Sequence, residues 1–264
     1  MDFFEALILG LAQGLSEFFP VSSSGHLLML QEILGIHEDG IVFEITVHIA
    51  TLASVLIVYR KRIAALISGV LRGEASATAY VGKLVLATLP AIASVLLAGD
   101  WFDAQFEAPQ VAGVCLLVTG AILWTTRSTI DRATASEPSW TVALLIGCAQ
   151  VLAILPGISR SGTTVAAALA LGVAPVAAAE FSFLMSVIAI SGAAVRSLPD
   201  LVAVPAAQIA PFAVGGAAAL VAGIAAISLF VRLLQTRGFY RFAYYTWTAG
   251  ALFLVWLHLG RGGG

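Results

Sequence analysis

Two polar, glycine-rich stretches in an otherwise apolar chain constrain the fold more than any other feature. Residues 10–26 and 147–163 align without a gap at an offset of 137 positions, which places position 13 on position 150. Seven pairs are identical: Gly10/Gly147, Ala12/Ala149, Gln13/Gln150, Leu15/Leu152, Ser22/Ser159, Ser24/Ser161 and Gly25/Gly162. The match predicts two similarly folded units, about 2–98 and about 140–231, within a single domain 1–264.

The setting of these stretches is that of a membrane protein. Hydrophobic residues make up 60% of the chain and charged residues only 11%, whereas a soluble domain carries about 25% charged residues. The basic residues are spread along the chain rather than gathered in a patch, so no nucleic-acid partner is expected. Residues 1–20 lack the positive start of a cleavable signal, since Asp2 and Glu5 stand there. We expect one multi-pass domain.

Six apolar runs are long enough to span a bilayer, which takes about 20 residues each. They lie near 41–59, 79–98, 108–126, 175–195, 207–231 and 242–259. The two matched regions, about 2–34 and 140–172, are broken at Pro20 and at Pro156-Gly157. A break frees backbone groups that hydrocarbon does not tolerate uncovered, so each region is predicted to be a re-entrant helical hairpin. The alternative for each is one kinked span followed by an interfacial helix.

The distribution of arginine and lysine predicts the orientation. With six spans, the basic flanks fall on one side, which should be the cytoplasm, and both termini fall outside. The residues on that side are Arg60, Lys61, Arg62, Arg72, Arg127, Arg132, Arg232, Arg237 and Arg241. Three spans separate the matched hairpins, so they enter from opposite faces, as in an inverted-topology repeat. Broken segments of such repeats tend to meet near the midplane, so the two polar stretches are expected to touch.

The polar residues of these stretches suit a phosphorylated ligand. Serine is a good N-cap, and helix starts offer free N–H groups and a partial positive charge. Arg160 adds a fork of donors for phosphate oxygens. The phosphate-binding candidates are Ser22, Ser24, Gly25, Ser159, Ser161 and Gly162. Taken singly, these serines and glycines have an alternative role in close helix packing.

Hydrolysis of a phosphoric anhydride also needs a nucleophile and a proton carrier. Ser23 or His26 can be the nucleophile, and Glu17 can be a general base or a ligand of a divalent cation. The alternative for Glu17 and Arg160 is an ion pair that only holds the hairpins together. A lone buried histidine is also often a satisfied core residue.

Other polar residues carry weaker signals. Glu44 and Glu180 stand near the start of spans in the two units and are expected to line the same cavity. His48 and Lys83 lie within spans as polar contacts or snorkelling groups. His37 and His258 are expected at the surface or the membrane interface.

Two motifs resemble those of a known family. Gln-Gly-Leu-Ser-Glu-Phe-Phe-Pro-Val-Ser-Ser-Ser-Gly-His at 13–26 and Pro-Gly-Ile-Ser-Arg-Ser-Gly at 156–162 resemble the signatures of the bacterial undecaprenyl-diphosphate phosphatases of the bacitracin-resistance type. The basic run at 59–62 and Ala-Glu-Phe-Ser-Phe at 179–183 also fit. The resemblance implies an enzyme of the bacterial inner membrane that removes the terminal phosphate of undecaprenyl diphosphate, a polyprenyl diphosphate lipid, and so recycles the carrier for cell-wall synthesis.

The resemblance also implies roles for single residues. The essential glutamate of the family falls on Glu17, its serine and histidine on Ser23 and His26, and its arginine on Arg160. The activity depends on a divalent cation, Mg²⁺ or Ca²⁺, and the site opens toward the periplasm. Some relatives carry a second glutamate where this chain has Gln13. A cation at this place would therefore have one carboxylate ligand, Glu17, and at position 13 only an amide oxygen. A homodimer is left open.

Two other membrane functions fit part of the pattern. Inverted repeats with broken helices are also typical of transporters, so a lipid-phosphate transporter or flippase is the main alternative. A lipid phosphatase of the vanadium-haloperoxidase-like class would need a second histidine shortly after Ser159-Arg160. The chain instead continues Ser-Gly-Thr-Thr-Val-Ala-Ala-Ala, which argues against that class.

Overall fold

The protein is described by a computed structural model that covers residues 1–35, 40–196, 206–236 and 238–261. In these ranges the chain is helical and has no β-strand, only an isolated bridge between Ala135 and Val173. The α-helices are α1 (Phe3–Phe18), α2 (Ser23–Leu34), α3 (Gly40–Val58), α4 (Arg60–Leu71), α5 (Ala75–Phe106), α6 (Pro109–Thr129), α7 (Trp140–Leu152), α8 (Arg160–Ala170), α9 (Pro175–Arg196), α11 (Ala206–Gln235) and α12 (Phe242–Arg261). Short 3₁₀ turns precede α7 (η1, Ile130–Arg132) and α12 (η2, Phe239–Arg241). His37 and Arg237 lie outside the described residues.

Each predicted span corresponds to one long helix. Among the described residues, α5, α6, α9 and α11 are long and apolar enough to cross a membrane, and α3 with α4 makes a fifth candidate bent by 76°. The chain is therefore a multi-pass helical membrane protein. The sixth predicted span is the 20-residue helix α12, whose crossing stays a prediction. Helix α5 runs past the predicted end at 98, where Ala98 has non-helical backbone angles, and continues to Phe106.

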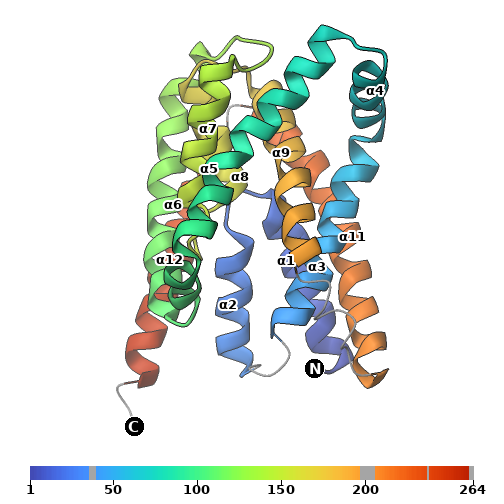
Figure 1. The fold of residues 1–264 in the computed structure, drawn as a ribbon. Coiled ribbons are helices and arrows are strands. Elements are labelled where there is room, and N and C mark those ends of the chain that lie inside the picture. The colour runs from blue at the N-terminus through green and yellow to red at the C-terminus, as the bar shows by residue number, and fades with distance from the viewer. Residues whose placement is uncertain (36–39, 197–205, 237, 262–264) are drawn as a thin grey trace.

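Both matched regions form helical hairpins. Helix α1 ends before Pro20 and α2 begins after it, and α7 and α8 flank Pro156-Gly157 in the same way. In Figure 1, α1 and α2 enter and return at the end of the bundle that holds the N-terminus, while α7 begins at the opposite end, where α4 lies. The two helices of each pair contact each other, so each pair is a helical hairpin, and its re-entrant course in a membrane stays a prediction.

Equivalent glycines in the two hairpins make equivalent close contacts. Helix α1 packs along α11, and α7 packs along α5. A Cβ added at Gly10 would collide with the backbone of Gly215 on α11, and one added at Gly147 would collide with the backbone of Ala87 on α5. Each hairpin therefore rests backbone to backbone against a long helix, an approach that only glycine permits.

Replacing Gly147 by alanine is expected to destabilise the fold by about 1–3 kcal/mol, because the new methyl group cannot be placed without moving α5. The matched control is Gly192→Ala on α9, where the added Cβ meets no atom within 4 Å beyond its chain neighbours and the nearby backbone of its own helix. Alanine improves helix propensity by up to about 1 kcal/mol at both sites. Thermal unfolding in detergent should therefore show a lower midpoint for Gly147→Ala only. Equal midpoints for the two variants would contradict the contact.

An aromatic cluster fixes the end of α1, and with it the residue before Phe18. The Phe18 ring meets Phe183 of α9 edge to face at 5.6 Å, and Phe183 in turn packs on Phe230 of α11 at 5.1 Å. All three rings are fully buried. Such pairs add about 0.5–1.5 kcal/mol beyond the area that they bury. The cluster holds the tip of the first hairpin, and therefore Glu17, at a defined place between the helices.

Candidate active site

Two helix starts with the same capping pattern face the centre of the bundle. Ser22 caps α2, and its Oγ accepts a hydrogen bond from the Gly25 N–H at 3.3 Å. Ser159 caps α8, and its Oγ accepts from the Gly162 N–H at 3.1 Å. Ser22 takes a φ of 69°, the only positive φ among the described residues other than glycine. Such backbone strain in a non-glycine residue often accompanies a functional turn.

The serines that follow repeat the correspondence. Ser24 Oγ lies 3.3 Å from Ser22 Oγ, and Ser161 Oγ lies 3.3 Å from Ser159 Oγ. Two hydroxyls and the first N–H groups of a helix are thus gathered at each start. Because these groups and the positive ends of two helix dipoles converge, the region can hold an anion.

The two loops touch, as their repeat relationship predicts. The Ser161 hydroxyl donates to the Phe19 carbonyl at 3.2 Å, across the two hairpins. A Cβ at Gly25 would lie 2.9 Å from the Gly157 Cα, and a Cβ at Gly162 would lie 3.1 Å from the Cβ of Pro20. The glycines therefore allow the close approach that brings the two polar stretches together.

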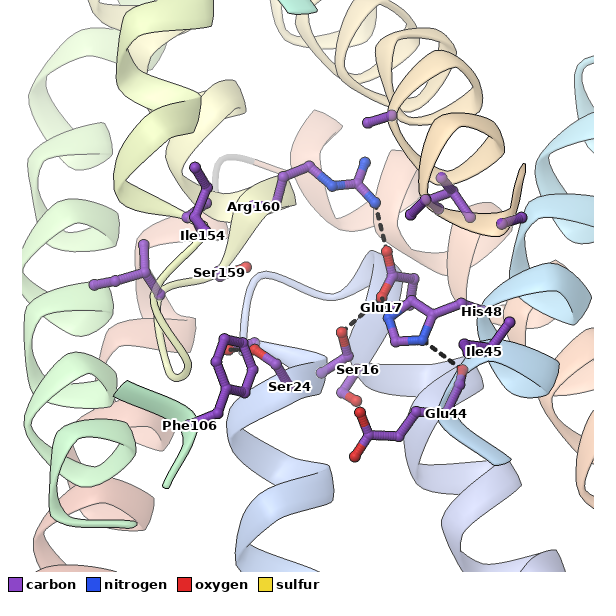
Figure 2. Close-up of a pocket in the computed structure, with 18 of the residues that line it drawn as sticks. Ser16, Glu17, Ser24, Glu44, Ile45, His48, Phe106, Ile154, Ser159 and Arg160 are labelled. Atoms are coloured by element: carbon purple, nitrogen blue, oxygen red, sulfur yellow. Dashed lines mark hydrogen bonds and ion pairs between the residues drawn. The ribbon is translucent and has the colours of Figure 1, made fainter. Parts of the chain in front are cut away.

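Glu17 is the centre of the hydrogen-bond network at this junction. Its Oε1 pairs with Arg160 Nη2 from the other hairpin, and its Oε2 accepts from Ser23 Oγ at 2.6 Å and from Gln13 Nε2 at 3.0 Å. The residue is only 7% exposed. Figure 2 shows the Glu17 carboxylate between the guanidinium and a serine hydroxyl. A serine that donates to a buried carboxylate has a proton acceptor already in place.

Arg160 keeps donors for a ligand. One terminal nitrogen binds Glu17, while the other, Nη1, is buried and has no hydrogen-bond partner among the described residues. An unpaired buried donor is costly, and a guanidinium binds phosphate oxygens in pairs. A phosphate oxygen bound at this site would satisfy the unpaired donor.

A cavity of about 460 Å³ opens beside this network. Its polar wall includes Glu17, Ser23 and Arg160, and its apolar wall includes Ile190 of α9 and Phe106 at the end of α5. Helix α5 starts next to α4, so its last residue lies toward the opposite end of the bundle, which is the end with the N-terminus (Figure 1). The cavity thus combines an anion-binding wall with a surface for an apolar chain.

Glu44 and His48 of α3 also line this cavity. The His48 Nδ1–H donates to the Glu44 carbonyl at 2.6 Å, and His48 Nε2 lies 3.8 Å from Glu17 Oε2. Gln31 of α2 donates to Glu44 Oε1 at 3.2 Å. Expecting Glu44 in a cavity was correct, whereas the proximity of His48 to Glu17 was not anticipated. The signal in the sequence was the spacing of four between Glu44 and His48. This spacing places both side chains on one face of a helix, so a cavity lined by Glu44 is also lined by His48.

His26 is separated from the other predicted catalytic residues. Its Nδ1–H donates to the Ser22 carbonyl at 2.8 Å, and its Nε2 accepts from the Tyr245 hydroxyl of α12 at 2.8 Å. The two rings stack with centroids 5.6 Å apart. His26 lines a second cavity, not the one that holds Glu17. The structure therefore brings Glu17, Ser23 and Arg160 together and places the His26 ring on the other side of the loop.

Glu180 does not share the cavity of Glu44, so that expectation was wrong. Its Oε1 accepts from Arg62 Nε at 2.8 Å and from the Tyr80 hydroxyl at 3.3 Å. Arg62 belongs to α4, and its guanidinium also lies over the Tyr80 ring at 4.8 Å. Glu44 and Glu180 therefore differ in their surroundings, because Arg62 of α4 forms an ion pair with the Glu180 carboxylate. Lys83 pairs with Glu137 at 3.2 Å, a polar contact as expected, and His258 is exposed.

Two possible oxygen ligands for a divalent cation, Glu17 and Gln13, stand on α1. The described residues contain no group of three or more His, Cys, Asp or Glu arranged for a metal. Glu17 supplies one carboxylate, and Gln13 Oε1 is a buried oxygen without a hydrogen-bond partner in the described chain. Mg²⁺ is commonly held by one or two carboxylates together with substrate phosphates. The donors therefore fit a cation whose coordination is completed by a phosphorylated ligand.

The fold and this site define a class: multi-pass helical membrane proteins in which two facing hairpins join a buried glutamate, a serine and an arginine beside an anion-binding pair of helix starts. The profile of the family described as bacitracin resistance protein BacA matches residues 6–252. That match covers nearly the whole chain, and the chain belongs to this family.

Several relatives of similar length carry one name. An undecaprenyl-diphosphatase of Carboxydothermus hydrogenoformans is 39% identical over 97% of this chain and 97% of its own length. An undecaprenyl-diphosphatase of Alcanivorax borkumensis is 37% identical over 97% of this chain and 100% of its own. One of Desulfosudis oleivorans is 39% identical over 96% of this chain and 98% of its own.

Proposed function

We propose that this protein hydrolyses undecaprenyl diphosphate to undecaprenyl phosphate and inorganic phosphate, and so returns the lipid carrier to cell-wall synthesis. The observation that carries the proposal is the Glu17–Ser23–Arg160 network at the crossing of the two hairpins. The names of the relatives, which match over nearly the full length, point to the same activity.

The diphosphate is bound by the two helix starts. The terminal phosphate accepts hydrogen bonds from Arg160 Nη1 and from serine hydroxyls of the two capped loops. Of the predicted phosphate-binding residues, Ser22, Ser24 and Ser159 line the cavity. Gly25 and Gly162 donate their N–H groups to the capping serines and Ser161 donates to the Phe19 carbonyl, so these three residues shape the loops. The apolar wall of the cavity, with Phe106 and Ile190, accommodates the first part of the isoprenoid chain.

Ser23 is the nucleophile that the contacts favour. Its Oγ attacks the terminal phosphorus, the new Oγ–P bond forms as the bridging P–O bond breaks, and the Ser23 proton passes to Glu17 Oε2. Undecaprenyl phosphate leaves with the bridging oxygen. Water then hydrolyses the phosphoserine, with Glu17 handling the proton, and releases inorganic phosphate. His26 is the alternative nucleophile, but its Nε2 is engaged by Tyr245.

A divalent cation, Mg²⁺ or Ca²⁺, is part of the proposal. Glu17 would hold it, with the Gln13 amide oxygen as a second donor, and the bound cation would neutralise charge on the diphosphate. Arg160 and the helix starts act on the same phosphate oxygens and stabilise the negative charge that develops in the transition state.

The proposed setting is the bacterial inner membrane, with six spans, two re-entrant hairpins and an inverted repeat of units 2–98 and 140–231. The opposed hairpins and the equivalent contacts of Gly10 and Gly147 support the repeat. Helix α4 contains Arg60, Lys61 and Arg62, so the positive-inside rule puts its end of the bundle in the cytoplasm. The cavity lies toward the other end, and the site therefore opens to the periplasm.

Phosphate release from undecaprenyl diphosphate by the purified full chain in detergent tests the proposal. Release is expected with Mg²⁺, is expected to stop with EDTA, and should return when Mg²⁺ or Ca²⁺ is added in excess. Release that persists in EDTA would contradict the cation. Absence of release from protein with a cooperative thermal unfolding transition would contradict the enzyme, and would favour a lipid-phosphate transporter built on the same anion site.

A further inference from the structure

A second, larger cavity lies beside the active site. It measures about 750 Å³ and is formed by α1, α2, the end of α11, η2 and the start of α12. Ser16 of α1 lines this cavity and also the one that holds Glu17, so the two are neighbours across the first hairpin. The catalytic steps proposed above make no use of it.

The walls of this cavity are apolar faces of helices. Helix α2 contributes His26, Met29, Leu30 and Ile33, whose spacing of three and four defines one face. Ile33 is 51% exposed, and His26, Met29 and Leu30 are half-buried. An apolar face that the protein leaves open within a membrane-spanning bundle is suited to a lipid chain, which gains close packing in a hollow that its shape fills.

The cavity also has one charged end. Arg241 of η2 lines it, is exposed, and has no side-chain ion pair or hydrogen bond among the described residues. Helix α12 follows η2 and runs to the end of the bundle that holds the N-terminus (Figure 1), so η2, which contains Arg241, precedes the part of α12 farthest from that end. One helical turn further along, Tyr245 and His26 form the hydrogen-bonded pair. The groove thus joins apolar helix faces to one positive charge, the combination that an anionic lipid requires.

We propose that this groove binds a polyprenyl monophosphate, with the phosphate on Arg241 and the isoprenoid chain along the apolar faces of α1, α2 and α12. The charge of the arginine selects an anionic headgroup. The inference rests on the proposed function, because a polyprenyl monophosphate is the lipid product of that reaction.

Photo-crosslinking tests the groove. The full chain in phosphatidylcholine nanodiscs is exposed to a polyprenyl monophosphate with a diazirine in its chain, and labelled peptides are mapped by mass spectrometry. Labels are expected on α2 and α12, competed by undecaprenyl phosphate. Arg241→Gln should lower this labelling about tenfold, since a charge-assisted bond to phosphate is lost, and Leu30→Trp should lower it by filling the hollow.

Matched controls come from the same surfaces. Arg72→Gln removes an exposed arginine at the end of α4, and Leu252→Trp enlarges a residue 65% exposed on α12 outside the groove. Both should label like the wild type. Labels confined to the Glu17 cavity, labels insensitive to Arg241→Gln and Leu30→Trp, or equal competition by phosphatidylglycerol would each overturn the proposal. Wild-type hydrolysis of the diphosphate is measured in parallel, so groove labelling without hydrolysis would contradict only the proposed function.

Discussion

Replacing Arg160 by alanine is expected to lower kcat/KM for undecaprenyl diphosphate by about 10²–10³, because the guanidinium stabilises charge on the transferring phosphoryl group. Arg160→Lys keeps the positive charge but loses the fork that binds Glu17 and phosphate together. It should therefore recover only part of the activity. Phosphate release at saturating and at low substrate concentration measures both effects.

The Arg160 variants need a stability control, since removing one partner of a buried ion pair costs about 3–5 kcal/mol. Arg62→Ala provides it. Arg62 pairs with Glu180 at 2.8 Å, away from the cavity. Each variant is compared with the wild type in thermal unfolding and in phosphate release. A loss of activity in Arg62→Ala as large as in Arg160→Ala would attribute the effect to folding, and an active Arg160→Ala would contradict the assigned role.

Replacing Ser23 by alanine is expected to lower kcat by about 10³ or more, because the attacking hydroxyl is removed while the rest of the site stays in place. His26→Asn should lose much less activity, since an amide can replace the donor to the Ser22 carbonyl and His26 does not line the Glu17 cavity. Tyr245→Phe, which removes the hydroxyl bound to His26, should remain close to the wild type.

The chemistry of a trapped intermediate separates the two nucleophiles. Substrate labelled with ³²P in the terminal phosphate is mixed with the enzyme and quenched in the millisecond range. Phosphoserine survives an acid quench, whereas phosphohistidine survives only in alkali. We expect acid-stable label on the peptide that contains Ser23. Label stable only in alkali, or a fully active Ser23→Ala, would show that the serine is not the nucleophile.

The hairpins and their contact were predictable because their causes are local or energetic. Pro20 and Pro156 lack a backbone N–H and disfavour a continuing helix, and α1 and α7 end before them. A charged side chain costs about 2.5–3.5 kcal/mol in the middle of a membrane on insertion scales. An ion pair between Glu17 and Arg160 was therefore expected. The structure places them in contact across the two hairpins.

The composition of the cavity was not predictable in the same way. Ser23 and His26 stand three residues apart, which suggests one face of a helix, yet they serve different cavities. The separation depends on Tyr245, 219 positions along the chain from His26. Phe106 reaches the cavity because α5 continues past its kink at Ala98, beyond the end that hydropathy predicts.

The sequence alone therefore determined the membrane class, the two broken segments and the pairing of Glu17 with Arg160, since proline geometry and the cost of buried charge act on any fold of this chain. Only the tertiary structure decided which side chains share a cavity. The packing of α3 places His48 near Glu17. Glu180 pairs with Arg62 of α4 instead of lining the cavity, and His26 bonds to Tyr245 of α12. Such choices follow from contacts between helices distant in sequence, and the short-range spacing of residues does not encode them.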